Sequence, residues 1–524
     1  MPQSPWLPNL PRPAPSGLWV VAWLGLAAPV QAGWLDDIDY TQLAAELGAA
    51  MPTGAGIPLM QTEASPAADI PEYLPQAGGP DAFAGTGIHA GKTFHPESGT
   101  GAFANHPLTV SSYFYANGSG VARGATQIHC YDAVDFLNRL YAGNAPPVLP
   151  GLVQNHSWIG DTGDPAVDTQ ILRRFDFMID RDGCSAVVGL NNAPAALSVF
   201  LGNSYHAIST GVLSGGHSQG GSNTDGSGRM KPDLVVNETA TSYASPIIAG
   251  CAAALLESAG TGNSSARKPQ VIKALLLAGA SKRNLPQWQR DTDAEPYDDV
   301  FGAGEVNLRN AYYIQQAGQQ AASTSVERTR RGWDFGNTTT AAGGRRYFFS
   351  IPAGQHARTF SAALTWHRSL IGILGNYSGS LADLTLRLYA AENFAPVGGA
   401  IGSSTSAVDN VEHLHFYNLP PGQYMIEVTA SSSNRPYGLA WEATTGWGPM
   451  LTPRASGDEI WLDASDLDPQ GTYTIEGAPG PAGPWTDEHS FRTADGTPAF
   501  TTSWQVPPPV GTRRFYRLRW VPVR

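Results

Sequence analysis

Residues 241–256 read TSYASPIIAGCAAALL, a run of small and aliphatic side chains interrupted by one proline. Because proline fits only the first turn of a helix, Pro246 predicts a buried helix that begins near Ser242. A serine at that position lies at the positive end of the helix, which favours the negative charge that develops when a hydroxyl attacks a carbonyl. The segment therefore indicates a nucleophile, with an ordinary capped core helix as the alternative.

The residues just upstream strengthen the first interpretation. Residues 228–236 (GRMKPDLVV) lead directly into the predicted helix, and the two segments together resemble the nucleophile region of the subtilisin-like serine proteases. The family has glycine where this chain has Ala240. The resemblance covers residues about 52–316. It implies an α/β fold, a three-layer domain with a mostly parallel sheet, in which Ser242 is the nucleophile.

A carboxylate follows the first predicted strand. Residues 52–64 (PTGAGIPLMQTEA) form a glycine-rich turn and a short apolar strand that ends at Glu63. Functional groups collect at the carboxyl ends of parallel strands, so Glu63 is well placed. The family has its triad aspartate at the matching point, and the resemblance implies that Glu63 is the triad acid. A solvated charge at a strand end is the alternative.

A histidine begins the next predicted helix, residues 105–114 (NHPLTVSSYF). Taken alone, His106 is better interpreted as a capping or turn histidine. The segment at residues 119–125 (SGVARGA), with a strand over 127–131 after it, resembles the stretch downstream of the catalytic histidine in the family. The resemblance therefore implies that His106 is the general base, although Pro107 departs from the family motif.

Two later strands carry the implied substrate contacts. Residues 152–160 (LVQNHSWIG) match the strand against which the family pairs an extended peptide, so Ser157, Trp158 and Ile159 are implied to bind substrate. Residues 184–192 (CSAVVGLNN) place Leu190 in the same pocket, and Asn191 where the family carries the amide that stabilises the oxyanion. The alternative for Asn191 is a plain turn after a strand.

A second serine motif competes with Ser242. Residues 216–220 (GHSQG) fit the nucleophile elbow of esterases, which requires a strand before the serine and a helix after it. The following residues, 221–228 (GSNTDGSG), are unsuited to a helix. We therefore interpret Ser218 as part of a surface loop.

The remaining chain suggests a domain order. Residues 1–32 have the layout of a signal peptide, and 33–322 are expected to form the catalytic domain. From residue 328 short alternating strands predict a β-sandwich or jelly roll over 328–445 and a small β domain over 450–524. Strands are expected over 346–351, 360–366, 386–389 and 423–428. We expect a protein that is secreted or periplasmic, without a membrane span.

Composition limits the partners. A net charge of -12 and a pI near 5.4 argue against nucleic acid, and Cys130, Cys184 and Cys251 are expected to be buried thiols, although one pair could bridge. No cofactor is expected; the acidic loop 291–299 could hold calcium, but a solvated turn is favoured. The resemblance to the subtilisin-like proteases implies a serine endopeptidase acting on protein or peptide substrates, and we expect a monomer. The alternative is an inactive binding module of the same fold.

Overall fold

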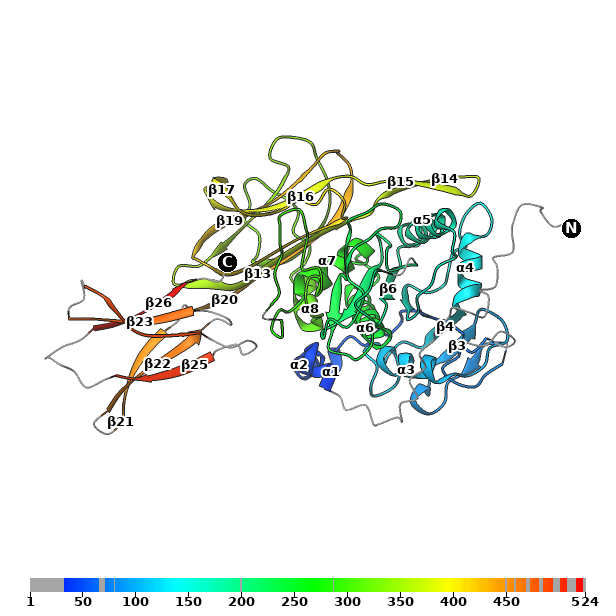
Figure 1. The fold of residues 1–524 in the computed structure, drawn as a ribbon, viewed down its shortest axis with the longest axis horizontal. Coiled ribbons are helices and arrows are strands. Elements are labelled where there is room, and N and C mark those ends of the chain that lie inside the picture. Colours follow the sequence, from blue (N-terminus) through cyan, green and yellow to red (C-terminus); the bar gives the residue numbers. More distant parts are fainter. Residues whose placement is uncertain are drawn as a thin grey trace, which may run out of the picture. The chain divides into compact units, whose positions relative to one another are not determined.

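The computed structural model describes residues 33–65, 71–79, 81–197, 200–285, 287–447, 450–456, 459–467, 472–479, 484–492, 500–506 and 515–521 (Figure 1). The predicted signal peptide, residues 1–32, lies outside these ranges. The chain forms two compact units. The first runs to Ile272 and includes Asp299–Gly302 and His367–Leu381; the second contains Lys273–Asp298, Ala303–Trp366 and the chain from Ala382.

An eight-stranded sheet forms the centre of the first unit, in the order β10-β7-β6-β5-β1-β4-β3-β2. All its pairs are parallel except β2 with β3. In chain order the strands are β1 Leu59–Glu63, β2 Phe83–Ala84, β3 Thr93–Pro96, β4 Gln127–Asp132, β5 Val153–His156, β6 Ser185–Gly189, β7 Ile208–Val212 and β10 Leu234–Val236. The predicted α/β fold with a mostly parallel sheet is confirmed.

Helices cover both faces of this sheet. The ring of His156, on β5, packs between Phe136 of α4 and Phe175 of α5. The preceding side chain, Asn155, points to the opposite face, as alternate residues of a strand must, and there it donates to Ser157 beside α6. The result is the three-layer arrangement of Figure 1, with helices α3 Asn105–Phe114, α4 Ala133–Tyr141, α5 Pro165–Asp182 and α6 Thr241–Ala259.

The central helix α6 packs very closely. Its side chains from Ala244 to Leu256 are buried, as the apolar composition predicts. A Cβ added to Gly250 would lie 2.5 Å from the Cβ of Val121, so the helix backbone touches the segment 119–125 directly. The small residues of both motifs therefore serve the packing of one helix against one loop.

The shorter elements of the described chain complete the two units. They are α1 Gly33–Asp37, α2 Tyr40–Leu47, the 3₁₀ turns Gly48–Ala50 and Gly87–His89, β8 Gly220–Gly221, β9 Met230–Lys231, α7 Pro269–Gly279 and α8 Leu308–Gln316. Within the described ranges, no helix has both the length and the apolar character needed to cross a membrane.

The second unit is built from antiparallel sheets. Two four-stranded sheets, β11-β20-β13-β18 and β12-β19-β16-β17, face each other, and Phe349 of one stacks on Phe360 of the other with ring centroids 5.5 Å apart. The strands are β11 Arg331–Asn337, β12 Arg345–Ile351, β13 Gln355–Trp366, β16 Leu384–Glu392, β17 Ala395–Ser404, β18 Val411–Leu419, β19 Gly422–Ala430 and β20 Pro436–Trp447. The predicted sandwich and its four expected strands are confirmed.

Two three-stranded sheets come next in the chain, β21-β22-β25 and β24-β23-β26. Their strands are β21 Met450–Ser456, β22 Glu459–Leu467, β23 Thr472–Ala478, β24 Thr486–Arg492, β25 Phe500–Gln505 and β26 Phe515–Val521. A small core of Ala464, Leu467 and Tyr473 joins them. The prediction that this part of the chain is again β is confirmed.

The division into units differs from the predicted catalytic domain of 33–322. Helix α8 groups with the second unit, where the indole Nε1–H of Trp333 donates to the carbonyl of Gln315 at 2.9 Å. In the other direction, the hairpin of β14 Ser369–Ile373 and β15 Asn376–Ser380 belongs to the first unit and lies along α5 (Figure 1). Residues far beyond 322 thus complete the first unit.

Hydrogen bonds between side chains of α5 and the hairpin backbone attach the hairpin to this helix. Gln170 on the helix accepts from the backbone N–H of Tyr377 at 2.7 Å and donates to its carbonyl at 3.1 Å, like a neighbouring strand. Arg174 donates to the carbonyl of Gly375 at 2.8 Å. Side chains of α5 therefore bind the main chain of the hairpin.

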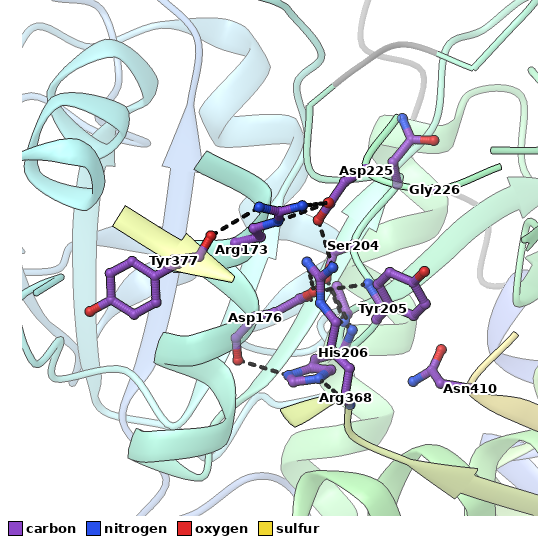
Figure 2. A network of polar contacts seen from close by, with 12 residues as sticks. Arg173, Asp176, Ser204, Tyr205, His206, Asp225, Gly226, Arg368, Tyr377 and Asn410 are labelled. Carbon is purple, nitrogen blue, oxygen red and sulfur yellow. Dashed lines mark hydrogen bonds and ion pairs between the residues drawn. The ribbon is translucent and has the colours of Figure 1, made fainter. Parts of the chain in front are cut away.

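A buried ion network secures the start of the hairpin (Figure 2). The guanidinium of Arg368 lies 2.7 Å from Asp176 and 2.6 Å from Asp225, and Arg173 makes a second ion pair with Asp225 at 2.7 Å. Asp176 is fully buried. Burial alone would raise the pKa of Asp176, but the nearby Arg368 charge and hydrogen bonds to the carboxylate hold it below its usual range. Asp176 and Arg368 thus depend on each other for charge compensation.

We predict that Arg368→Met lowers the free energy of unfolding by about 3–5 kcal/mol, because it leaves the fully buried Asp176 without its cation, whereas Asp225 keeps Arg173. Urea denaturation of the full chain measures the change. Arg139→Met is the control: it breaks the more exposed pair of Arg139 with Asp135 in the same unit and should cost about 0.2–1 kcal/mol. Equal small losses in the two variants would contradict the role given to the network.

Candidate functional site

The acid and the histidine implied by the sequence form a pair. Glu63 ends β1, and His106 is the second residue of α3. The Nδ1 of His106 and the Oε2 of Glu63 are 2.7 Å apart. Glu63 is fully buried, whereas 44% of the His106 side chain is exposed. The pair therefore joins a buried carboxylate to an imidazole that solvent and substrate can reach.

Gln61 and Tyr115 hold this carboxylate in place. The amide of Gln61 donates to Oε1 of Glu63 at 2.8 Å and to the carbonyl of Pro107 at 2.9 Å, and the Tyr115 hydroxyl donates to the Gln61 oxygen. Because Gln61 and Glu63 are two residues apart on one strand, their side chains share a face. Neither Gln61 nor Tyr115 was predicted from the sequence as a supporting residue. A glutamine in an otherwise apolar strand was the available signal.

The Glu63 contact also sets the charge and tautomer of His106. Burial by itself would lower the pKa of His106, but the negative charge of Glu63 and the hydrogen bond to it raise the pKa above the ordinary value. A carboxylate that accepts from Nδ1 places the neutral ring's proton on that nitrogen. The Nε2 atom is then free to accept a proton.

Ser242 lies in the first turn of α6, as the sequence predicts. Its helix has no capping side chain at Ala240; instead Asn192, from the loop after β6, accepts the backbone N–H of Thr241 at 2.7 Å. The ring of Tyr243 lies 6.4 Å from that of His106, so the histidine faces the beginning of this helix. Between His106 and Ser242, both within the described chain, the structure forms no hydrogen bond, and such catalytic contacts often tighten only in the substrate complex.

Pro246 lies in the second turn of the helix, one turn later than the sequence analysis places it. Proline has no N–H, so the carbonyl of Ser242, four residues earlier, loses its normal partner. The hydroxyl of Ser157 donates to that carbonyl at 3.0 Å and lies 3.0 Å from the hydroxyl of Ser245. The end of β5 is thereby attached to the backbone of the predicted nucleophile.

Asn191 follows β6 at the carboxyl edge of the sheet. Its backbone N–H donates to the hydroxyl of Ser218 at 3.2 Å, and its carbonyl accepts from the N–H of Ser218 at 2.9 Å. Ser218 is fully buried, which corrects its placement in a surface loop. The element directly after it is the short strand β8 and not a helix, so the strand, serine and helix order of an esterase elbow is absent there. Ser218 supports the loop of Asn191.

The four residues implied to bind substrate have different environments. Trp158 is buried and packs on Phe200 in the core, and Leu190 is 2% exposed. Ser157 is engaged with α6, as described above. Ile159 is 41% exposed, so of the four it has the side chain most open to a ligand.

The departures from the family motif are accommodated in the structure. Ala240 has φ −147° and ψ 147°, an extended conformation open to any residue, so glycine is not required there. Pro107 is the third residue of α3, within the first turn, where proline is tolerated. Leu190 packs against Gly202, at which a Cβ would lie 2.6 Å from a leucine methyl.

Two other sequence expectations concern residues outside this site. All three cysteines are free and buried, as favoured by their surroundings. In the acidic loop, Asp293 pairs with Arg290 at 3.1 Å, and Asp298 accepts from the backbone N–H of Gln289 at 2.9 Å. Two of the loop's carboxylates thus already have partners within the protein.

Comparison with known proteins gives structural similarity alone. No protein-family model and no curated protein matches the chain. Among solved structures it is similar to proteases from Pseudoalteromonas arctica, with 17% identity over 53% of this chain and 97% of theirs and a TM-score of 0.32. It is also similar to the prenylagaramide maturation protease PagA, with 16% identity, 52% and 98% coverage and a TM-score of 0.35.

A third similar structure is the epidermin leader peptide processing serine protease of Staphylococcus aureus. The two chains share 13% identity over 55% of this chain and 82% of that one, with a TM-score of 0.35. TM-scores this low do not assign the chain to a family.

We predict that Ser157→Ala destabilises the fold by about 0.5–1.5 kcal/mol, since it removes the hydrogen bond to the carbonyl of Ser242. In that background Pro246→Ala should recover part of the loss, because the new N–H can reach the same carbonyl. In the wild-type protein Pro246→Ala should give no such gain in stability, because Ser157 already donates to this carbonyl. Free energies of unfolding for the four proteins test this, and strictly additive effects would contradict the link between the two residues.

Proposed function

We propose that the protein is a serine endopeptidase that hydrolyses peptide bonds with Ser242 as nucleophile. The observation that carries the proposal is the Glu63–His106 hydrogen bond, which leaves Nε2 of an imidazole near the first turn of α6 able to act as a base. The resemblance of the sequence motifs to the subtilisin-like proteases supports the same assignment.

In this proposal His106 takes the proton of Ser242 as the hydroxyl attacks the substrate carbonyl, and later gives it to the leaving amine. Glu63 stays ionised, orients the ring through Nδ1 and stabilises the imidazolium. Gln61 is a positioning residue, because it touches Glu63 and the backbone of α3 rather than the reacting atoms.

The tetrahedral oxyanion would be stabilised by the side-chain amide of Asn191 and by the N-terminus of α6. Each element that carries these groups is fixed by hydrogen bonds: Ser218 holds the backbone of Asn191, and Asn192 caps α6. Preorganised donors of this kind stabilise the transition state without moving during the reaction.

We propose protein or peptide substrates, bound as an extended strand along Ser157–Ile159, with Leu190 in the pocket wall. The proposed enzyme is exported, loses residues 1–32 during export and acts as a monomer without a cofactor. A catalytically inactive binding module is the competing proposal. It is motivated by the residues that differ from the subtilisin-like motifs. Three of these, Pro107, Leu190 and Ala240, fit their surroundings in the structure.

We expect a fluorophosphonate probe to label Ser242 and the Ser242→Ala variant to lose both labelling and peptidase activity. Ser258→Ala is the matched control: it lies on the same helix, with its hydroxyl bonded to the carbonyl of Leu255, and should remain active. Well-folded wild-type protein that takes up no label would support the inactive binding module.

We expect Glu63→Gln to lower turnover by roughly 10³–10⁴-fold, since removing the acid of subtilisin's own triad costs about 3 × 10⁴. Glu63 raises the pKa of His106, so the wild-type rate should fall as pH drops through that raised value. Without the Glu63 charge this acidic limb should move to lower pH. A pH–rate profile measures both effects.

The control for this change is Glu97→Gln. Glu97 also accepts from a histidine Nδ1, that of His129 at 2.8 Å, elsewhere on the same sheet. Its loss should leave turnover and the acidic limb unchanged. A Glu63→Gln variant with full turnover would remove Glu63 from the proposed triad.

A further inference from the structure

A polar cavity, partly open to solvent, lies in the second unit. Its volume is about 140 Å³, similar to the engineered cavity of roughly 150 Å³ that binds benzene in an apolar protein core. Its walls instead carry hydroxyls, an amide and charged groups, from Ser281, Lys282, Arg283, Asn310, Ser361 and His415. A cavity with this lining suits a small polar ligand.

Lys282 is the unusual member of the lining. It is 5% exposed, and the structure gives its ammonium weak contacts at 3.4 Å to the carbonyl of Ala280 and to Nε2 of His413, with the Trp288 ring 5.0 Å away. Among the described residues no carboxylate lies within ion-pair distance of it. Burial without such a partner lowers the pKa of Lys282 to about 7.

His415 adds unused hydrogen-bonding capacity to the same cavity. Both of its ring nitrogens are buried, and neither has a hydrogen-bond partner in the described chain. Burial, and then the charge of Lys282, lower the pKa of His415, so the ring is neutral and carries one N–H. The neighbouring His413 is neutral for the same reasons.

The remaining charges around the cavity favour an anion. Arg283 adds a positive charge to the lining. The one carboxylate in the walls, Glu442, is already paired with Arg331, whose Nε donates to it at 2.7 Å. When Lys282 is protonated, the lining therefore holds a buried ammonium that has no carboxylate at ion-pair distance among the described residues.

We propose that this cavity binds a small oxyanion, with the Lys282 ammonium as its counter-ion and the lining hydroxyls and the His415 N–H as further donors. The shared chemistry is that of phosphate and of a short carboxylate such as acetate. The inference concerns a site made only of second-unit residues and does not depend on the proposed peptidase activity.

Isothermal titration calorimetry of the full chain with sodium phosphate and with sodium acetate, at constant ionic strength in chloride, tests the proposal. We expect one site for at least one of the two anions below pH 7, weakening above it as Lys282 loses its proton. Tighter binding of phosphate or of acetate identifies the source of the oxyanion. Absence of binding by both would overturn the proposal.

Variants separate this site from adventitious binding. Lys282→Met should abolish binding and leave the fold at least as stable, because it removes an unpaired buried charge. Lys268→Met, which removes an exposed lysine outside the cavity, should bind like the wild type. His415→Phe provides a second measurement, with weaker binding expected, if the Lys282 variant does not fold. If binding is the same in the cavity variants as in the wild type and does not depend on pH, the site holds an adventitious ion only.

Discussion

The proposed site depends on how the backbone at Ser242 is held. Pro246 deprives the Ser242 carbonyl of its helical partner, and Ser157 at the end of β5 replaces the missing donor. The same hydroxyl contacts Ser245 and accepts from Asn155. One side chain therefore ties the strand implied to bind substrate to the helix that carries the proposed nucleophile, and the proline that weakens the helix makes the attachment possible.

The other parts of the site are fixed by the same kind of contact, a side chain that satisfies a neighbouring backbone. Gln61 links Glu63 to the carbonyl of Pro107, and Asn192 caps α6 in place of Ala240. The residues of the proposed site come from β1, from the ends of β5 and β6 and from two helices. Hydrogen bonds between these elements set the distances between the residues. Preorganisation of this type is what electrostatic catalysis requires.

The sequence predicts much of the local structure. The apolar helix that begins near Ser242 and the strand that ends at Glu63 are found where the sequence predicts them. Contacts between distant segments were not predictable, because nothing in a local pattern reports them: Tyr115 reaches Gln61, and Ser218 is buried against Asn191. The hairpin at 369–380 was missed for the same reason, since its partners on α5 lie about two hundred residues earlier.

That hairpin has a consequence for the order in which the chain is made. Domains generally fold as units from the N-terminus during synthesis. Here the carboxylates of Asp176 and Asp225 meet Arg368 only after the ribosome has passed the first strands of the sandwich. The first unit is thus completed by residues translated after β11, β12 and β13. Until the hairpin emerges, the Asp176 carboxylate lacks its Arg368 partner, whereas Asp225 already has Arg173.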